Sequence, residues 1–149
     1  MGCLCSKTKS IPENIDPKIL PSFVPALRYC RVIKCYDGDT ITVAAFYPED
    51  QLCKFSVRIA GIDCPEIKTP DPNEKEVAVL ARDRVTNLIL GQIVELKNIQ
   101  TEKYGRLLAT VLYQDQSVGD ILLRERLAVE YRGGTKTGPS NWKNYLADR

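Results

Sequence analysis

The chain has 149 residues, of which 44% are hydrophobic and 27% are charged, and its formal net charge is +2. This length and composition predict one soluble globular domain, and the small net charge means that any nucleic-acid binding must rest on a local basic patch. The sequence contains no histidine. Histidine-based catalysis and histidine metal sites are therefore excluded, which leaves carboxylates, arginines, lysines, tyrosines and cysteines for chemistry.

The first nine residues carry a lipidation pattern. Gly2 follows the initiator methionine, and Ser6 stands where N-myristoylation requires a hydroxyl residue. Cys3 and Cys5 are candidate palmitoylation sites, and a second acyl chain would stabilise the weak anchor that one myristoyl chain provides. We expect residues 1–9 to bind a cytoplasmic membrane face, the alternative being a frayed tail with two incidental cysteines. No apolar stretch is long enough for a secretory signal or a membrane span.

Residues 10–27 contain four prolines, which prevent a continuous helix. An extended arm is predicted, with one helical turn beginning at Asp16 and Pro17. Because the arm is too apolar for a free linker, part of it is expected to lie along the domain formed by residues 28–149. The cysteines of that domain lack paired metal-binding spacing and are expected to be reduced thiols.

Two charged runs come next. Asp37-Gly38 predicts a tight turn before a strand over residues 40–45, whose alternating pattern is typical of a half-buried strand. Asp39 therefore lies at the mouth of that strand. A second strand is predicted over residues 57–62, with small residues that indicate a bend. It carries Arg58, which is costly to bury unless a carboxylate or an anion meets it.

The residues after this second strand add further polar groups. Asp63 ends the strand, and Cys64, which precedes a proline, is biased towards extended geometry that presents its backbone carbonyl beside Asp63. Glu66 follows three residues later and is near enough to share the site. The alternative interpretation is a solvated turn and a charged loop that closes a barrel strand.

The rest of the chain predicts a helix capped by Asn73 that runs to about Leu90, and strands over residues 93–99 and 107–113. A second helix is predicted over residues 118–127, and Ser140 is the expected cap of a short last helix. This order predicts an α+β fold, a five-stranded Greek-key barrel of the OB type with two to three helices.

The turn between the last two predicted strands contains Lys103, Tyr104 and Arg106. The planar guanidinium of Arg106 matches the geometry of phosphate oxygens, and the other two side chains add a charge and a hydroxyl. Taken alone, this turn would equally suit an exposed loop.

Together, the runs 37–40, 58–66 and 103–106 resemble the staphylococcal nuclease (thermonuclease) family, and the resemblance extends from Arg31 to about Tyr131. It implies a staphylococcal nuclease-like barrel and a Ca²⁺ ion held by Asp39, Asp63 and the backbone carbonyl of Cys64. It also implies that Glu66 orients or activates the attacking water, that Arg58 and Arg106 clamp the phosphate, and that Lys103 and Tyr104 touch a terminal phosphate.

The activity implied by the resemblance is calcium-dependent hydrolysis of DNA or RNA that leaves 3′-phosphates. Single strands should be preferred, because their bases can enter a groove lined by aromatic residues such as Tyr104 and Tyr131. The sequence departs from the family pattern at two places. Cys64 replaces the usual threonine or alanine, a change that a backbone ligand tolerates. The loop over residues 67–73 also looks shorter than in the secreted bacterial enzyme of the family. The alternatives are a non-catalytic OB module that binds single-stranded nucleic acid or a protein tail, and a lipid-anchored adaptor with a vestigial site. The complete acid set argues against both.

Overall fold

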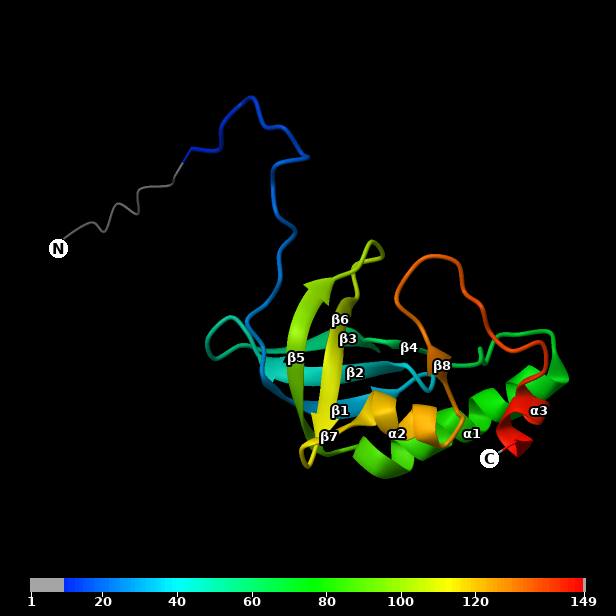
Figure 1. The fold of residues 1–149 in the computed structure, drawn as a ribbon. Helices are drawn as coiled ribbons and strands as arrows, with labels where there is room; N and C mark the ends of the chain where they lie inside the picture. The colour runs from blue at the N-terminus through cyan, green and yellow to red at the C-terminus, as the bar shows by residue number, and fades with distance from the viewer. Residues whose placement is uncertain (1–9, 149) are drawn as a thin grey trace.

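The structure is a computed structural model that describes residues 10–148. Gly2, Cys3 and Cys5, the predicted lipidation sites, lie outside the described residues. Five strands form a barrel in the order β3-β2-β1-β5-β6, and a parallel pairing of β3 with β6 closes it (Figure 1). These strands are β1 (Tyr29–Cys35), β2 (Thr40–Phe46), β3 (Leu52–Ile59), β5 (Ile93–Thr101) and β6 (Leu107–Tyr113). The predicted five-stranded α+β barrel is confirmed.

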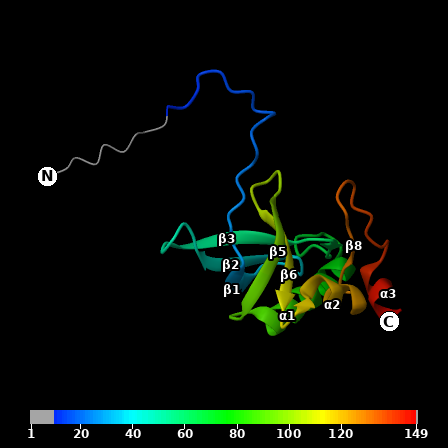
Figure 2. The ribbon, with the colours of Figure 1, turned by 60° about the vertical axis from the view of Figure 1, so that its left-hand side comes forward.

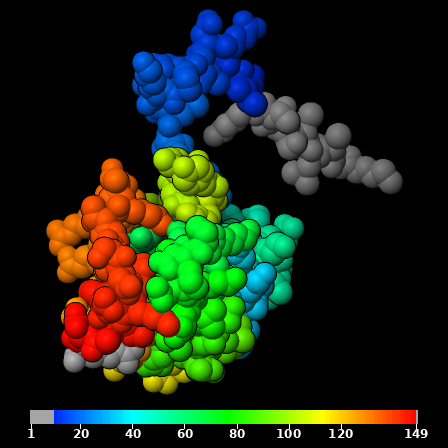
Figure 3. All heavy atoms as spheres, turned by 90° about the vertical axis from the view of Figure 1, so that its right-hand side faces the viewer, coloured from blue at the N-terminus to red at the C-terminus, as the bar shows by residue number. Residues whose placement is uncertain are grey.

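Three helices and three short strands complete the described part of the chain. The strand β4 (Ile62–Asp63) pairs with β8 (Val129–Glu130), and β7 (Gln116–Ser117) extends β6. The helices are α1 (Pro72–Ile89), α2 (Val118–Arg124) and α3 (Trp142–Ala147). In the space-filling view, α3 and the segment before it pack alongside α1 (Figure 3).

The barrel core follows from the alternation of β2. Ile41, Val43 and Ala45 are buried, whereas the intervening residues are only partly buried and face outward. One side of α1 covers the same core, through Val77, Ala78, Ala81, Val85 and Ile89. Each fully buried valine or isoleucine side chain stabilises the fold by about 1.5–3 kcal/mol.

Several predicted helix boundaries were wrong. The cap of α1 is Asp71, whose carboxylate accepts a hydrogen bond of 2.9 Å from the Asn73 N–H, so Asn73 lies inside the helix. Asp71 is the cap because Pro72, with its fixed φ, suits the first helical position. The cap of α3 is Asn141 and not Ser140, because the Asn141 side chain accepts from the backbone of the first turn.

Two strand and helix ends also differ from the prediction. The single strand predicted over residues 57–62 is two strands, because Gly61 turns the chain at φ +83° between β3 and β4. The helix α2 ends at Arg124, three residues before the predicted end. Arg126 has φ +52°, which is incompatible with a continuing helix.

The arm before the barrel extends away from it (Figures 1 and 2). Asp16 starts the predicted turn, since its carboxylate accepts a hydrogen bond of 2.9 Å from the Lys18 N–H. The arm meets the barrel near its end, where the Phe23 carbonyl accepts from the Thr101 hydroxyl at 2.7 Å and Leu27 is buried. Residues 10–22 are exposed, so only the last few residues of the arm lie along the barrel. No helix within residues 10–148 is long and apolar enough to cross a membrane.

Candidate functional site

An open cleft of about 620 Å³ lies at one end of the barrel. Figure 1 shows the turn between β5 and β6 and the loop after β8 rising on the same side of the molecule, and both loops line the cleft. Residues from the three charged runs line it as well. The lining includes Asp37, Asp39, Arg58, Glu66, Glu102, Lys103, Tyr104, Arg106, Tyr131, Arg132 and Lys136.

Arg58 is the centre of the buried part of this site. The pairing of β2 with β3 sets Thr40 opposite Arg58, which brings Asp39 to the same end of the barrel. One Arg58 nitrogen, Nη2, donates to Asp39 Oδ2 at 3.2 Å and to Asp63 Oδ1 at 3.0 Å. The Tyr131 ring lies 5.1 Å from the guanidinium carbon. All three charged side chains are almost fully buried, so the prediction that Arg58 meets a carboxylate is confirmed.

Asp39 is held from several directions. Burial raises the pKa of its carboxyl group, whereas the positive charge of Arg58 and the Cys64 N–H oppose that rise. The Cys64 N–H donates to Asp39 Oδ2 at 3.3 Å, and the Thr40 hydroxyl donates to the other oxygen at 3.0 Å. The backbone of Cys64 thus lies beside both predicted carboxylates. Its thiol is buried, and burial raises its pKa well above the usual value. Cys64 therefore stays a neutral thiol and no nucleophile.

Gly38 has a different role from the predicted one. Its φ lies outside the left-handed region, so a turn conformation does not require glycine here. Glycine is required here because there is no room for a side chain. An added Cβ would lie 2.8 Å from Cys64 Sγ and 2.8 Å from the Ala81 Cβ. Glycine therefore lets the segment from Asp37 to Asp39 pack directly against α1 and the Cys64 loop.

Asp37 also lines the cleft, although the sequence predicts it only as part of a turn. Its Oδ1 atom is buried and has no hydrogen-bond partner. Burial, with the nearby Asp39 and Glu66 carboxylates, raises the pKa of Asp37 to about 6. The only sequence signal was its spacing in Asp37-Gly38-Asp39, which a solvated turn would also explain.

The donor set fits a hard cation. Asp39 and Asp63 pair with the Arg58 guanidinium, and Asp37, which lines the cleft with Asp39, has one buried oxygen atom without a hydrogen-bond partner. Ca²⁺ binds such oxygens, together with backbone carbonyls and water. Within residues 10–148, no group of three or more histidine, cysteine, aspartate or glutamate side chains forms a ready-made metal site. The predicted ligand set has only two side chains and one carbonyl, so it is not such a group.

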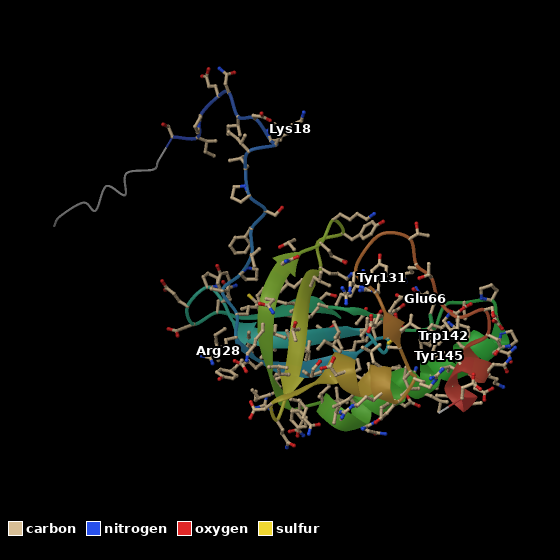
Figure 4. All side chains as sticks on the ribbon, viewed as in Figure 1. Lys18, Arg28, Glu66, Tyr131, Trp142 and Tyr145 are labelled. Atoms are coloured by element: carbon tan, nitrogen blue, oxygen red, sulfur yellow. The ribbon has the colours of Figure 1, made fainter. Side chains whose placement is uncertain are left out.

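Glu66 and Lys136 lie at the opening of the buried cluster. The Lys136 ammonium is 2.7 Å from Glu66 Oε1 and 2.9 Å from Asp63 Oδ1. Burial lowers the pKa of Lys136, but its bonds to Glu66 and Asp63 outweigh this effect and the pKa is raised. Figure 4 shows Glu66 and Tyr131 on the same side of the barrel as the loop after β8. Lys136 is not among the site residues that the sequence predicts, and its one local signal is the Gly133-Gly134 pair before it.

The turn between β5 and β6 supplies the other wall of the cleft. Arg106 forms an ion pair with Glu102, which is not among the site residues that the sequence predicts. Lys103 lies over the exposed ring of Tyr104, with 4.9 Å between its nitrogen and the ring centroid. The cleft is lined, as predicted, by Lys103, Tyr104 and Arg106. The ion pair and the ring contact described here both lie within the turn.

Comparisons with known proteins agree with this geometry. Residues 56–147, more than half of the chain, match the family described as staphylococcal nuclease homologue. Endonuclease YncB of Bacillus subtilis is 34% identical over 109 residues, which cover 69% of this chain and 49% of that protein. Staphylococcal-like nuclease CAN1 of Arabidopsis thaliana is 28% identical over 102 residues, 67% of this chain and 30% of that protein. An uncharacterized endonuclease of Haemophilus influenzae is 30% identical over 103 residues, 69% of this chain and 52% of that protein.

The chain spans about half or less of the length of these curated relatives. The matched region contains Arg58, Asp63 and Glu66 as well as the turn with Arg106, and it excludes Asp39, which the barrel brings to the same cleft. On the family match and the closed five-stranded barrel, the chain belongs to the staphylococcal nuclease family.

Proposed function

We propose that the protein is a calcium-dependent nuclease that hydrolyses phosphodiester bonds of DNA or RNA. One observation carries the proposal: Arg58 is paired with two buried carboxylates, Asp39 and Asp63, and it lines an open cleft together with Asp37 and Arg106. Burying two acids around one arginine is costly for a module that only binds nucleic acid. A reaction that needs a cation at this point accounts for that cost.

Asp39, Asp63 and the Cys64 carbonyl would hold the Ca²⁺ ion, and Asp37 would lie close by with its unpaired oxygen. The bound ion supplies a Lewis acid that polarises the phosphate and helps to position water. The carboxylates of Asp37, Asp39 and Asp63 would repel one another less with a cation bound between them.

Side chains of the cleft would accept the proton of the attacking water and stabilise the charge on the phosphate. Glu66, half exposed at the opening, is placed to accept the proton of an attacking water. Arg58 and Arg106 stabilise the negative charge that grows on the phosphoryl oxygens. Arg106 is paired with Glu102 in this structure, so phosphate binding requires Arg106 to exchange a carboxylate for a phosphate oxygen.

The rest of the cleft favours single strands. Tyr104 is 74% exposed beside Lys103, and Tyr131 lines the opposite wall. Exposed rings stack on unpaired bases, while Lys103 and Arg132 attract the phosphate backbone of the nucleic acid. Cleavage that leaves a 3′-phosphate is part of the proposal and is read directly from end-group analysis of the products.

The test is cleavage of labelled single-stranded DNA and RNA with Ca²⁺ and with excess chelator. Activity should require Ca²⁺, and Arg58→Ala should lower turnover by on the order of 10³-fold. Arg82→Ala is the matched control, because Arg82 pairs with Asp83 on α1, outside the cleft lining. Full activity in chelator, or equal turnover of the two variants, would refute the proposal.

We further propose that the protein is tethered to the cytoplasmic face of a membrane through acyl chains on Gly2, Cys3 and Cys5. The support is the sequence pattern alone. The exposed arm of residues 10–22 then serves as a spacer between the acyl groups and the barrel.

A further inference from the structure

The loop after β8 is built to reach the candidate site. Gly133 and Gly134 have φ values of +94° and +86°, left-handed conformations that other residues adopt only with strain. The Tyr131 hydroxyl donates to the Gly134 carbonyl at 2.9 Å, while the Tyr131 ring packs on Arg58. The loop is therefore tied to the buried cluster immediately before it delivers Lys136.

Lys136 bridges two acids that differ in environment. Its ammonium lies 2.7 Å from Oε1 of Glu66, a side chain that is 53% exposed. It also lies 2.9 Å from Oδ1 of Asp63, a side chain that is 8% exposed. The same Asp63 oxygen accepts from Arg58 at 3.0 Å. Lys136 thus joins a half-exposed surface carboxylate to the buried carboxylate of the cluster.

We propose that Lys136 is a positioning residue that holds Glu66 for proton transfer and competes with the divalent cation for Asp63. The inference rests on the proposed function. A long, half-exposed glutamate has many rotamers, and an ion pair to Lys136 restricts it to those directed at the cleft floor. An ammonium ion that contacts Asp63 Oδ1 repels a cation that uses the same oxygen.

The two roles together predict opposite effects on calcium affinity and on reaction rate, which a purely structural lysine would not produce. Removing the charge should tighten calcium binding, because the competitor of the cation is gone. The same change should slow the reaction, because Glu66 is no longer held. A lysine needed only for folding would instead weaken both properties together.

The experiment compares Lys136→Met and Lys136→Arg with the control Lys143→Met. Lys143 is a fitting control because it is exposed to a similar degree and pairs with Glu76 at 2.5 Å, outside the cleft lining. The calcium dissociation constant of metal-free protein is measured by titration calorimetry, which does not depend on activity. The kcat on a short single-stranded DNA is then measured at saturating Ca²⁺.

Lys136→Met should bind Ca²⁺ about threefold more tightly, as expected for loss of a partly exposed competing ion pair. Its kcat should fall about tenfold, a fraction of what a positioned general base contributes. Lys136→Arg should recover most of the kcat, because a guanidinium still reaches Glu66, and Lys143→Met should match the wild type in both measurements.

An active wild type whose Lys136→Met variant keeps both the calcium affinity and the kcat would overturn the role of Lys136 and leave the proposed function intact. A variant that loses both affinity and kcat would overturn it as well, since that is the structural pattern. A wild type that cleaves neither DNA nor RNA would overturn the proposed function first, and the positioning role with it.

Discussion

Asp37→Asn should stabilise the metal-free protein at neutral pH. The pKa of Asp37 is raised from 3.8 to about 6 by burial and by the Asp39 and Glu66 carboxylates. Between these two values the folded state binds more protons than the unfolded state, so stability falls as the pH rises through this window and stays lower above it. A rise of about 2 pKa units corresponds to at most about 3 kcal/mol. Because Asp37 is only partly buried, solvent screening reduces the expected gain to about 1 kcal/mol.

Urea unfolding in excess chelator measures this gain. Asp37→Asn should exceed the wild type by about 1 kcal/mol at pH 7.5, and the difference should shrink as the pH falls and vanish near pH 3, where the wild-type carboxyl group is mostly protonated in both states. The control is Asp50→Asn in the exposed turn between β2 and β3, which should show no difference at either pH. In saturating Ca²⁺ the advantage should shrink or reverse, because the variant has lost a carboxylate beside the cation.

An Asp37→Asn protein that is no more stable than the wild type at pH 7.5 would refute this reasoning. So would a gain that persists unchanged at pH 3, since repulsion among carboxylates cannot cause a difference when the group is neutral in both states.

Three further outcomes are expected. Gly38→Ala should lower the free energy of unfolding by about 1–3 kcal/mol in urea, because its Cβ would meet Cys64 and Ala81 at 2.8 Å, and an unchanged midpoint would contradict this. Arg106→Ala should lower turnover by on the order of 10³-fold while its thermal midpoint stays near that of the wild type; near-normal turnover would remove Arg106 from the site. In fractionated eukaryotic cells, Gly2→Ala should stay soluble while the wild type pellets with membranes, and equal partitioning would contradict the tether.

The barrel could be predicted because its signals are local. The alternation of β2 and the apolar side of α1 mark their buried residues without reference to the rest of the chain. The cap of α1 was missed because two capping residues, Asp71 and Asn73, lie close together. Pro72 decides between them, since its fixed φ favours the first helical position after Asp71.

The candidate site was predictable where burial itself demanded a partner. Arg58 on a buried strand required an acid, and the structure supplies Asp39 and Asp63. Lys136 could not be found in this way, because its contact with Glu66 joins two loops that are 70 residues apart in the chain. Nothing in a local pattern reports such a contact, and an exposed lysine after two glycines has many ordinary explanations.

Because the parallel pairing of β3 with β6 closes the barrel, the candidate site can form only late in synthesis of the chain. β3 carries Arg58, but its partner β6 begins at Leu107, and Tyr131 and Lys136 follow later still. During synthesis the ribosome must therefore release most of the domain before the two arginines can face one another across the cleft. Until then the nascent chain has the acids of the site without its enclosing wall.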